Sequence, residues 1–234
     1  MDSRRTKYTL DYYIDLAKRL EDMGAHILGI KDMAGLLKPY AAERLISALK
    51  EHIDIPIHFH THDTAGNGVA SVIKAAEAGV DIVDLAIPAL SGLSSQPSMG
   101  AVVAALEDSD RRTGISLENI QLLDEYWERV RQYYEPFESG LKASTSEVYV
   151  HEMPGGQYSN LRVQAKALGL IDRWNDVVKA YVMANRLMGD VVKVTPSSKA
   201  VGDLALFMVQ NDLNEENILT KGEHLTFPDS VIDF

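Results

Sequence analysis

The chain has 234 residues, of which 46% are apolar and 24% charged, so it can form a sizeable core and is not a generally disordered chain. Acidic residues outnumber basic ones by 34 to 23, giving a formal net charge of -11 that disfavours nucleic acids and anionic membranes as partners. The absence of cysteine excludes disulfides, thiolate metal sites and a cysteine nucleophile, and it suits a reducing compartment such as the cytoplasm. No apolar run reaches the roughly 20 residues needed to span a bilayer, and the first residues lack the apolar core of a secretory signal.

The first half of the chain alternates between predicted helices and strands. A helix is expected over residues 9–23, ending before Gly24. Three strand–helix units follow, with strand-and-loop runs at 26–35, 53–66 and 80–92 and helical patterns at 40–51, 67–78 and 97–107, the last with Pro97 in its first turn. This order predicts a parallel α/β sheet.

Beyond about residue 115 the alternation stops. Helical patterns cover 117–134, 159–169, 173–188 and 196–211, with breaks at 136–140 and 153–159. The paired glycines of the second break indicate a tight turn, and Thr195-Pro196 reads as the N-cap and first turn of the last helix. We therefore expect two domains, an α/β core over residues 1–115 and a mostly helical extension over 116–234.

The chemistry gathers on the second predicted strand. Side chains of a strand alternate between its two faces, so His58, His60 and His62 share one face. Imidazoles two residues apart can converge on one metal ion, and the innermost, His58, is expected to support or pack. The alternatives are a row of hydrogen-bonded histidines and an exposed edge strand.

The neighbouring strands add polar groups to the same face. Lys31 is expected to point with the histidines from the first strand, and Asp84 from the third. A lysine at a strand end is otherwise simply solvated. One face therefore carries His, Lys and Asp side chains and is the predicted site.

Several motifs resemble the carboxyltransferase domain of the pyruvate carboxylase family. They are GIKDMAG (29–35), HFHTHDTAGNG (58–68), SGLSSQPSMG (91–100), EVYVHEMPGGQYSNL (147–161) and VKVTPSSKAVGDLALFMVQ (192–210). The resemblance implies a TIM barrel with a helical, funnel-like C-terminal extension. A (β/α)₈ barrel has eight strands and typically ~250 residues, so the three strand–helix units here correspond to its last three.

The resemblance also implies a divalent metal, zinc or manganese, at the barrel mouth. The matching ligands are a carbamylated Lys31, His60 and His62, with an aspartate of the first barrel strand as the fourth. A lysine carbamate is an anionic oxygen ligand, so this modification turns a cationic side chain into a metal-binding one.

The implied reaction moves CO₂ from carboxybiotin to pyruvate and gives oxaloacetate. Thr195 matches the threonine that relays a proton between the pyruvate methyl group and the biotin ring nitrogen, and Ser198 and Lys199 match candidates for the biotin pocket. A hydroxyl can both donate and accept, which suits a relay.

The match begins before the sixth strand–helix passage of the barrel. The first five strands, the pyruvate-binding arginine and glutamine, the biotin carboxylase part and the biotin carrier part have no counterpart in the sequence, so we expect a fragment or one subunit of a split, oligomeric enzyme that is weak alone. A mitochondrial location would need a transit peptide on the N-terminal part of the enzyme, which has no counterpart in this sequence. The alternatives are an oxaloacetate decarboxylase or transcarboxylase type of subunit, a metal-dependent acyl lyase on the same plan, and a non-catalytic chain.

Overall fold

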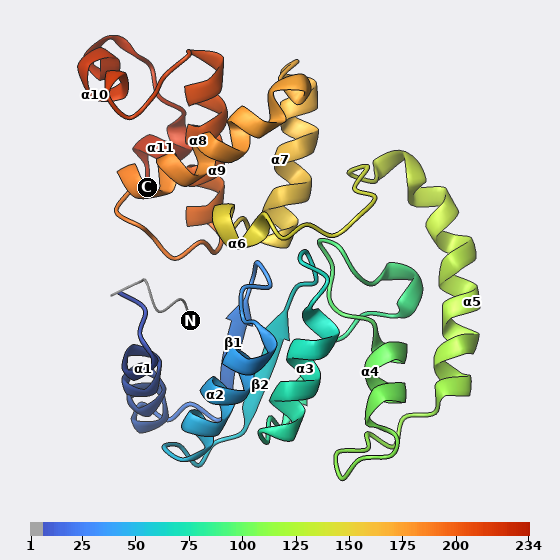
Figure 1. Cartoon of the computed structure of the whole chain (residues 1–234). Helices are drawn as coiled ribbons and strands as arrows, with labels where there is room; N and C mark the ends of the chain where they lie inside the picture. The colour runs from blue at the N-terminus through green and yellow to red at the C-terminus, as the bar shows by residue number, and fades with distance from the viewer. Residues whose placement is uncertain (1–6) are drawn as a thin grey trace. The chain divides into compact units, whose positions relative to one another are not determined.

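The computed structural model describes residues 7–234, which form two compact units (Figure 1). Unit 1 takes the chain through Glu138 together with Lys142–Thr145, and unit 2 comprises Ser139–Leu141 and Ser146–Phe234. The first six residues, part of the start of the chain where the sequence predicts no secretory signal, lie outside the described residues. By its contacts the helix after residue 116 belongs to unit 1. The division after residue 115 stays a prediction about domains.

Unit 1 is built around a three-stranded parallel sheet in the order β1-β2-β3. Its elements are α1 (Leu10–Asp22), β1 (Leu28–Asp32), α2 (Pro39–Lys50), β2 (Ile57–Thr61), α3 (Gly68–Glu77), β3 (Ile82–Val83), the 3₁₀ turn η1 (Pro88–Leu90), α4 (Met99–Leu106), α5 (Leu117–Tyr134) and the 3₁₀ turn η2 (Glu135–Phe137). The strand–helix alternation and the parallel pairing confirm the predicted parallel α/β sheet with its three strand–helix units.

The core of unit 1 lies between the sheet and the helices α1 to α4. Ile57 and Phe59 of β2 are fully buried there, against Ile46 of α2 and Val72 of α3. Burying their apolar surface stabilises the folded chain by about 25 cal/mol for each Å² removed from water. Because these side chains fix one face of β2 against the helices, the residues between them must point to the opposite face.

Local signals set the ends of two helices in unit 1. The side chain of Thr9 accepts a hydrogen bond from the Tyr12 amide at 3.2 Å and caps α1. Ser116 caps α5 in the same way, at 3.3 Å from the Asn119 amide. After α1, Gly24 has a φ of 89°, the left-handed conformation that follows many helices and that glycine adopts without strain.

Unit 2 is a helical assembly in which α8 and α9 pack along one another (Figure 1). Its elements are α6 (Val148–His151), α7 (Gly155–Ala167), the 3₁₀ turn η3 (Ile171–Arg173), α8 (Trp174–Leu187), α9 (Ser197–Gln210), α10 (Asn217–Lys221), the 3₁₀ turn η4 (Gly222–His224) and α11 (Asp229–Ile232). The predicted helical extension is confirmed. Within residues 7–234 no helix is both long and apolar enough to cross a membrane.

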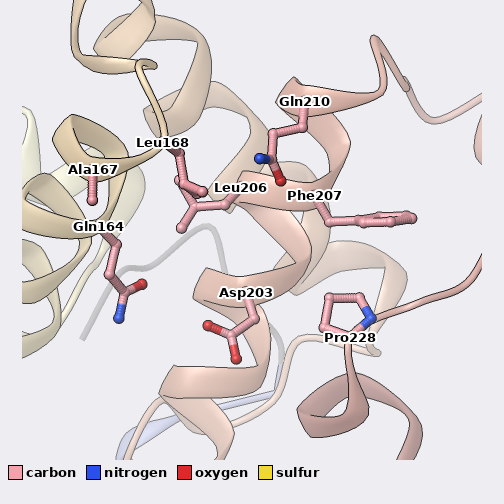
Figure 2. A pocket seen from close by; sticks show the side chains of 8 residues that line it. All are labelled: Gln164, Ala167, Leu168, Asp203, Leu206, Phe207, Gln210 and Pro228. Atoms are coloured by element: carbon pink, nitrogen blue, oxygen red, sulfur yellow. The ribbon is translucent and has the colours of Figure 1, made fainter.

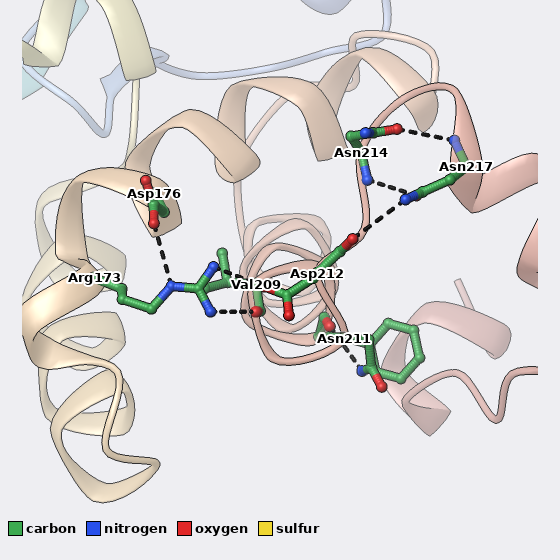
Figure 3. Close-up of polar contacts among 8 residues, drawn as sticks. Arg173, Asp176, Val209, Asn211, Asp212, Asn214 and Asn217 are labelled. Carbon is green, nitrogen blue, oxygen red and sulfur yellow. Dashed lines mark hydrogen bonds and ion pairs between the residues drawn. The ribbon is translucent and has the colours of Figure 1, made fainter.

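Arg173 fastens the start of α8 to the end of α9 (Figure 3). Its guanidinium donates to Asp176 at 3.2 Å, to the carbonyl of Val209 at 3.1 Å and to Asp212 at 3.0 Å. The first contact is an ion pair with a carboxylate in the first turn of α8, and the second satisfies a carbonyl in the last turn of α9, where carbonyls lack partners within the helix. Because the guanidinium presents several donors in a fixed plane, a single side chain can join both helices.

Three local predictions are wrong. Gly155 and Gly156 do not form a tight turn but begin α7, because Pro154 provides the extended residue that precedes a helix. Pro97 precedes the helix α4, whose N-cap is Ser98. Thr195 is not the N-cap of α9: Pro196 occupies that position without a side-chain cap.

Candidate functional site

The polar side chains of the sheet gather on the face opposite the core. In the register of β1 and β2, Lys31 lies beside His60 and Gly29 beside His58, while Ile57 and Phe59 are buried on the other side. The alternation predicted from the sequence is therefore confirmed. The last histidine, His62, follows the end of β2 and is itself buried.

Asp84 links two of the histidines. It follows β3, and its two carboxylate oxygens lie 2.7 Å from Nε2 of His58 and 2.8 Å from Nδ1 of His60. Since an ionised carboxylate can only accept, both ring nitrogens carry their proton toward Asp84. Burial opposes ionisation of this carboxyl group, but the hydrogen bonds from His58 and His60 outweigh it and lower the pKa of Asp84.

His62 is held by the backbone of a loop. Its Nδ1 lies 2.7 Å from the carbonyl oxygen of Ser94, an acceptor only, so the proton of the neutral ring sits on Nδ1. In the same loop, the carbonyl oxygen of Ser95 accepts a hydrogen bond from the Asp63 amide at 2.9 Å. Burial is the main cause that lowers the pKa of His62, and the hydrogen bond to Ser94 offsets it in part. Burial therefore favours the neutral imidazole that a metal ligand must be.

These two anchors turn the free nitrogens of the rings toward each other. Nε2 of His60 lies 3.3 Å from Nε2 of His62. With Nδ1 protonated in both neutral rings, each Nε2 presents a lone pair, so only a proton or a cation between them makes this approach favourable. Two imidazole nitrogens bound to a tetrahedral zinc ion at about 2.05 Å would themselves be about 3.3 Å apart. The pair therefore fits a divalent metal.

Further ligands to such an ion are not in place among residues 7–234. No group of three His, Cys, Asp or Glu side chains in that range could hold a metal ion. Lys31 lies next to His60 on β1, and its side chain is exposed. An unmodified ammonium has no lone pair to offer, so Lys31 would serve as a ligand only as its carbamate.

The loop after β1 holds the end of β2 in place. Asp32 accepts the amides of Leu36 and Leu37 at 2.8 and 2.9 Å and the hydroxyl of Thr61 at 2.9 Å. Gly35 in that loop has a φ of 68°, and a Cβ there would lie 2.3 Å from the carbonyl oxygen of His62. The loop thus approaches the backbone of His62 more closely than any residue with a side chain allows.

The other predicted site residues belong to unit 2. Thr195 is exposed in the segment before α9, Ser198 is buried in its first turn, and Lys199 is exposed. The ammonium of Lys199 contacts the carboxylate of Asp203 one turn further on. The structure thus brings Lys31, His60 and His62 together in unit 1 and Thr195, Ser198 and Lys199 together in unit 2.

Asp203 also lines a shallow pocket of unit 2, about 340 Å³ in volume (Figure 2). Most of the wall is apolar and comes from α7, α9 and the segment before α11: Gln164, Ala167, Leu168, Asp203, Leu206, Phe207, Gln210 and Pro228. The carboxylate of Asp203 already accepts from Lys199 and Ser230. None of the predicted site residues lines this pocket.

Two supporting groups escaped the sequence analysis. The Ser94 carbonyl is a backbone atom, which no residue type announces. Asp32 had a recognisable signal, a carboxylate at a strand end followed by a short loop, where Asp side chains commonly accept backbone amides.

Comparison with known proteins places the whole chain. The family described as HMGL-like matches residues 1–126, and the conserved carboxylase domain matches residues 148–234. Pyruvate carboxylase of Bacillus subtilis is 60% identical over 233 residues, and that of Staphylococcus aureus is 55% identical over 231. These matches cover 100% and 99% of this chain but 20% of each relative. The chain therefore spans about a fifth of the length of the curated relatives it matches.

Solved structures agree in fold. The carboxyl transferase domain of Rhizobium etli pyruvate carboxylase is 54% identical with a TM-score of 0.96, covering 100% of this chain and 39% of that one. The same domain described with pyruvate and biocytin gives a TM-score of 0.97 at 54% identity, with the same coverage of both chains. The chain belongs to the HMGL-like family, within which it corresponds to the carboxyltransferase region of pyruvate carboxylases.

Proposed function

We propose that the chain carries the metal-binding and proton-relay residues of a carboxyltransferase that moves CO₂ from carboxybiotin to pyruvate and gives oxaloacetate. The observation that carries this proposal is the 54% identity, over the full chain, to a carboxyl transferase domain described with pyruvate and biocytin. The remaining barrel, the biotin carboxylase part and the biotin carrier part would come from the rest of a longer, oligomeric enzyme. A cytoplasmic location, favoured by the lack of cysteine, belongs to the same proposal.

His60, His62 and a carbamylated Lys31 would hold a divalent zinc or manganese ion. Bound there, such an ion supplies electrostatic stabilisation to the negative charge that develops on pyruvate as its methyl group loses a proton. The chain contributes the orientation of the ligands: Asp84 fixes the ring of His60 and the Ser94 carbonyl fixes that of His62. The convergent Nε2 atoms support this assignment.

Thr195 would relay the proton. Its Oγ1 can accept the proton from the pyruvate methyl group and donate its own to the ring nitrogen of biotin, without holding net charge at any point. The exposure of Thr195 supports this role, because a relay must be reachable by both substrates. Ser198 and Lys199, both in the first turn of α9, are the proposed contacts to biotin. The exposed side chain of Lys199 is accessible to a ligand, whereas that of Ser198 is buried, so the support is stronger for Lys199.

The test measures oxaloacetate formation from pyruvate and carboxybiotin by the complete natural protein. Thr195→Ala is expected to lower the rate by about 100-fold or more, the range of general acid–base catalysis, with the metal content unchanged. His60→Ala and Lys31→Ala are expected to lose the metal, measured by elemental analysis. Thr220→Ala, an exposed threonine of α10, is the matched control and is expected to be fully active.

Other outcomes would identify the alternatives. Decarboxylation of oxaloacetate without acceptance of CO₂ would indicate a decarboxylase type of subunit. Absence of both reactions in a protein that purifies with a partner would indicate a non-catalytic chain.

A further inference from the structure

Unit 2 contains an ion pair that is almost removed from solvent. The Nζ of Lys193 lies 3.1 Å from Oε2 of Glu152, and the two side chains are 9% and 12% exposed. The other ion pairs among the described residues each have at least one partner that is far more exposed, as in the pair of Arg173 and Asp176 at 43% and 51%. Taking both charges out of water costs several kcal/mol per ion, so stability alone is a weak reason for such a pair.

The pair joins two segments that are 41 residues apart in the sequence. Glu152 directly follows α6 in the left-handed conformation, with a φ of 55°. The amide of the next residue, Met153, is held by Nδ1 of His151 at 3.0 Å, and the Met153 side chain is fully buried. The backbone of Glu152 is therefore held between two buried residues, His151 and Met153, and its carboxylate provides an anchor for Lys193.

Lys193 lies two residues before Thr195, and a second anchor lies two residues after it. The Oγ of Ser197 is 2.5 Å from the carbonyl of Val192 and 2.6 Å from that of Val194, and it accepts the Val194 amide at 3.1 Å. Ser197 itself is buried. The backbone around Thr195 is thus held at Lys193 by charge and at Ser197 by hydrogen bonds, while Thr195 stays exposed between them.

We propose that the Glu152–Lys193 ion pair positions Thr195, so that both are positioning residues of the proton relay. This inference rests on the proposed function, in which Oγ1 of Thr195 must meet the pyruvate methyl group and the biotin nitrogen. A displacement of about 1 Å in a reacting group can lower a rate by about 100-fold. A neutral pair of side chains would remove the charged anchor at Lys193 and leave the hydrogen bonds around Ser197.

The test uses Glu152→Gln and Lys193→Met in the complete natural protein, with the double variant. Each single variant is expected to lower kcat for carboxyl transfer by about 10-fold or more, with the KM for pyruvate changed less than about 2-fold. The double variant is expected to lose no more than the worse single variant, because both remove the same interaction. Hydrogen exchange at the amides of Val194 and Ser198 is expected to accelerate in all three.

Controls separate positioning from general stability. Asp176→Asn removes an exposed ion pair of the same unit and is expected to leave kcat, KM and the exchange at both amides unchanged. Lys193→Arg keeps the positive charge on a larger, planar group, so it is expected to fold even where Lys193→Met does not. It is still expected to lower kcat without raising KM. A merely structural pair would lower the amount of folded protein and leave kcat per bound metal as in the wild type.

The two proposals fail in different ways. If Thr195→Ala is as active as the wild type, or the wild type transfers no carboxyl group, the proposed function is wrong. If Thr195→Ala is impaired while Glu152→Gln, Lys193→Met and Lys193→Arg keep the wild-type kcat, the positioning role is wrong and the proposed function stands. A rise in KM at unchanged kcat would also overturn the positioning role.

Discussion

The Nε2 atoms of His60 and His62 face each other across 3.3 Å because each ring is held from behind by an acceptor. Asp84 holds His60 at 2.8 Å and the Ser94 carbonyl holds His62 at 2.7 Å, so the protons point away from the gap between the rings. The metal affinity of the site therefore depends on groups that would not touch the ion.

Asp84→Asn is expected to weaken metal binding by about 10- to 100-fold. The amide keeps the shape of the side chain but lacks the negative charge that orients His60 and raises the basicity of its ring. Competition with a chromophoric zinc chelator measures the affinity. Asp81→Asn is the matched control, because Asp81 accepts the Ile57 amide at 2.8 Å and Lys50 at 3.0 Å at the opposite end of β2. Equal zinc affinity in the Asp84 and Asp81 variants would contradict the orienting role of Asp84.

The face of β2 that carries the histidines could be predicted because it follows from a period of two and needs no partner. The same alternation predicted Asp84 on this face, but its hydrogen bonds to His58 and His60 depend on how the chain after β3 approaches β2, and the Ser94 carbonyl belongs to the backbone, so these contacts could not be predicted. The N-cap prediction at Thr195 failed for a similar reason. The amides of Ser198 and Lys199 in the first turn of α9 donate to the backbone carbonyls of Val194 and Pro196, so no side chain is needed as the cap, and the residue type at Thr195 does not reveal this.

Gly35→Ala is expected to destabilise unit 1 by about 2 kcal/mol or more and to weaken metal binding. The new Cβ would lie 2.3 Å from the His62 carbonyl oxygen, and the φ of 68° adds about 1–2 kcal/mol for a residue with a side chain. Urea denaturation and zinc competition measure the two effects. Gly29→Ala on β1, where a Cβ meets nothing within 4 Å and φ is not positive, is expected to cost nothing in stability. A stable Gly35→Ala with native zinc affinity would show that the loop after β1 can retreat from His62.

Tyr181→Phe is expected to leave unit 2 as stable or to stabilise it by about 1 kcal/mol. Tyr181 is fully buried in α8, and its hydroxyl has no hydrogen-bond partner among the described residues. Removing a buried, unsatisfied hydroxyl removes its desolvation cost. Thermal unfolding measures the change, with Tyr181→Leu as a comparison that leaves a cavity and is expected to destabilise by about 1–3 kcal/mol. A loss of stability in Tyr181→Phe would indicate that a buried water satisfies the hydroxyl.

His151 is expected to make the stability of unit 2 depend on pH. Burial lowers its pKa to about 4 from an ordinary value of 6.5. Its Nδ1 accepts the Met153 amide at 3.0 Å, so protonation would also break that hydrogen bond. Below pH 6.5 the unfolded chain takes up a proton that the folded chain does not. The contribution of neutral His151 to the free energy of unfolding is therefore fully present above pH 6.5. It is lost as the pH drops toward 4, by about 3 kcal/mol in total.

His151→Asn tests this dependence, because the Asn side-chain oxygen can replace Nδ1 as the acceptor for Met153 and does not titrate. Chemical denaturation at pH 7.5 and 4.5 gives the loss of stability for each protein. The loss is expected to be smaller in His151→Asn than in the wild type by about 2–3 kcal/mol. His224→Asn, an exposed histidine of unit 2, is expected to show the wild-type loss. If His151→Asn loses as much stability on acidification as the wild type, the pH dependence arises from the carboxylates, and His151 is accessible to protons in the folded state.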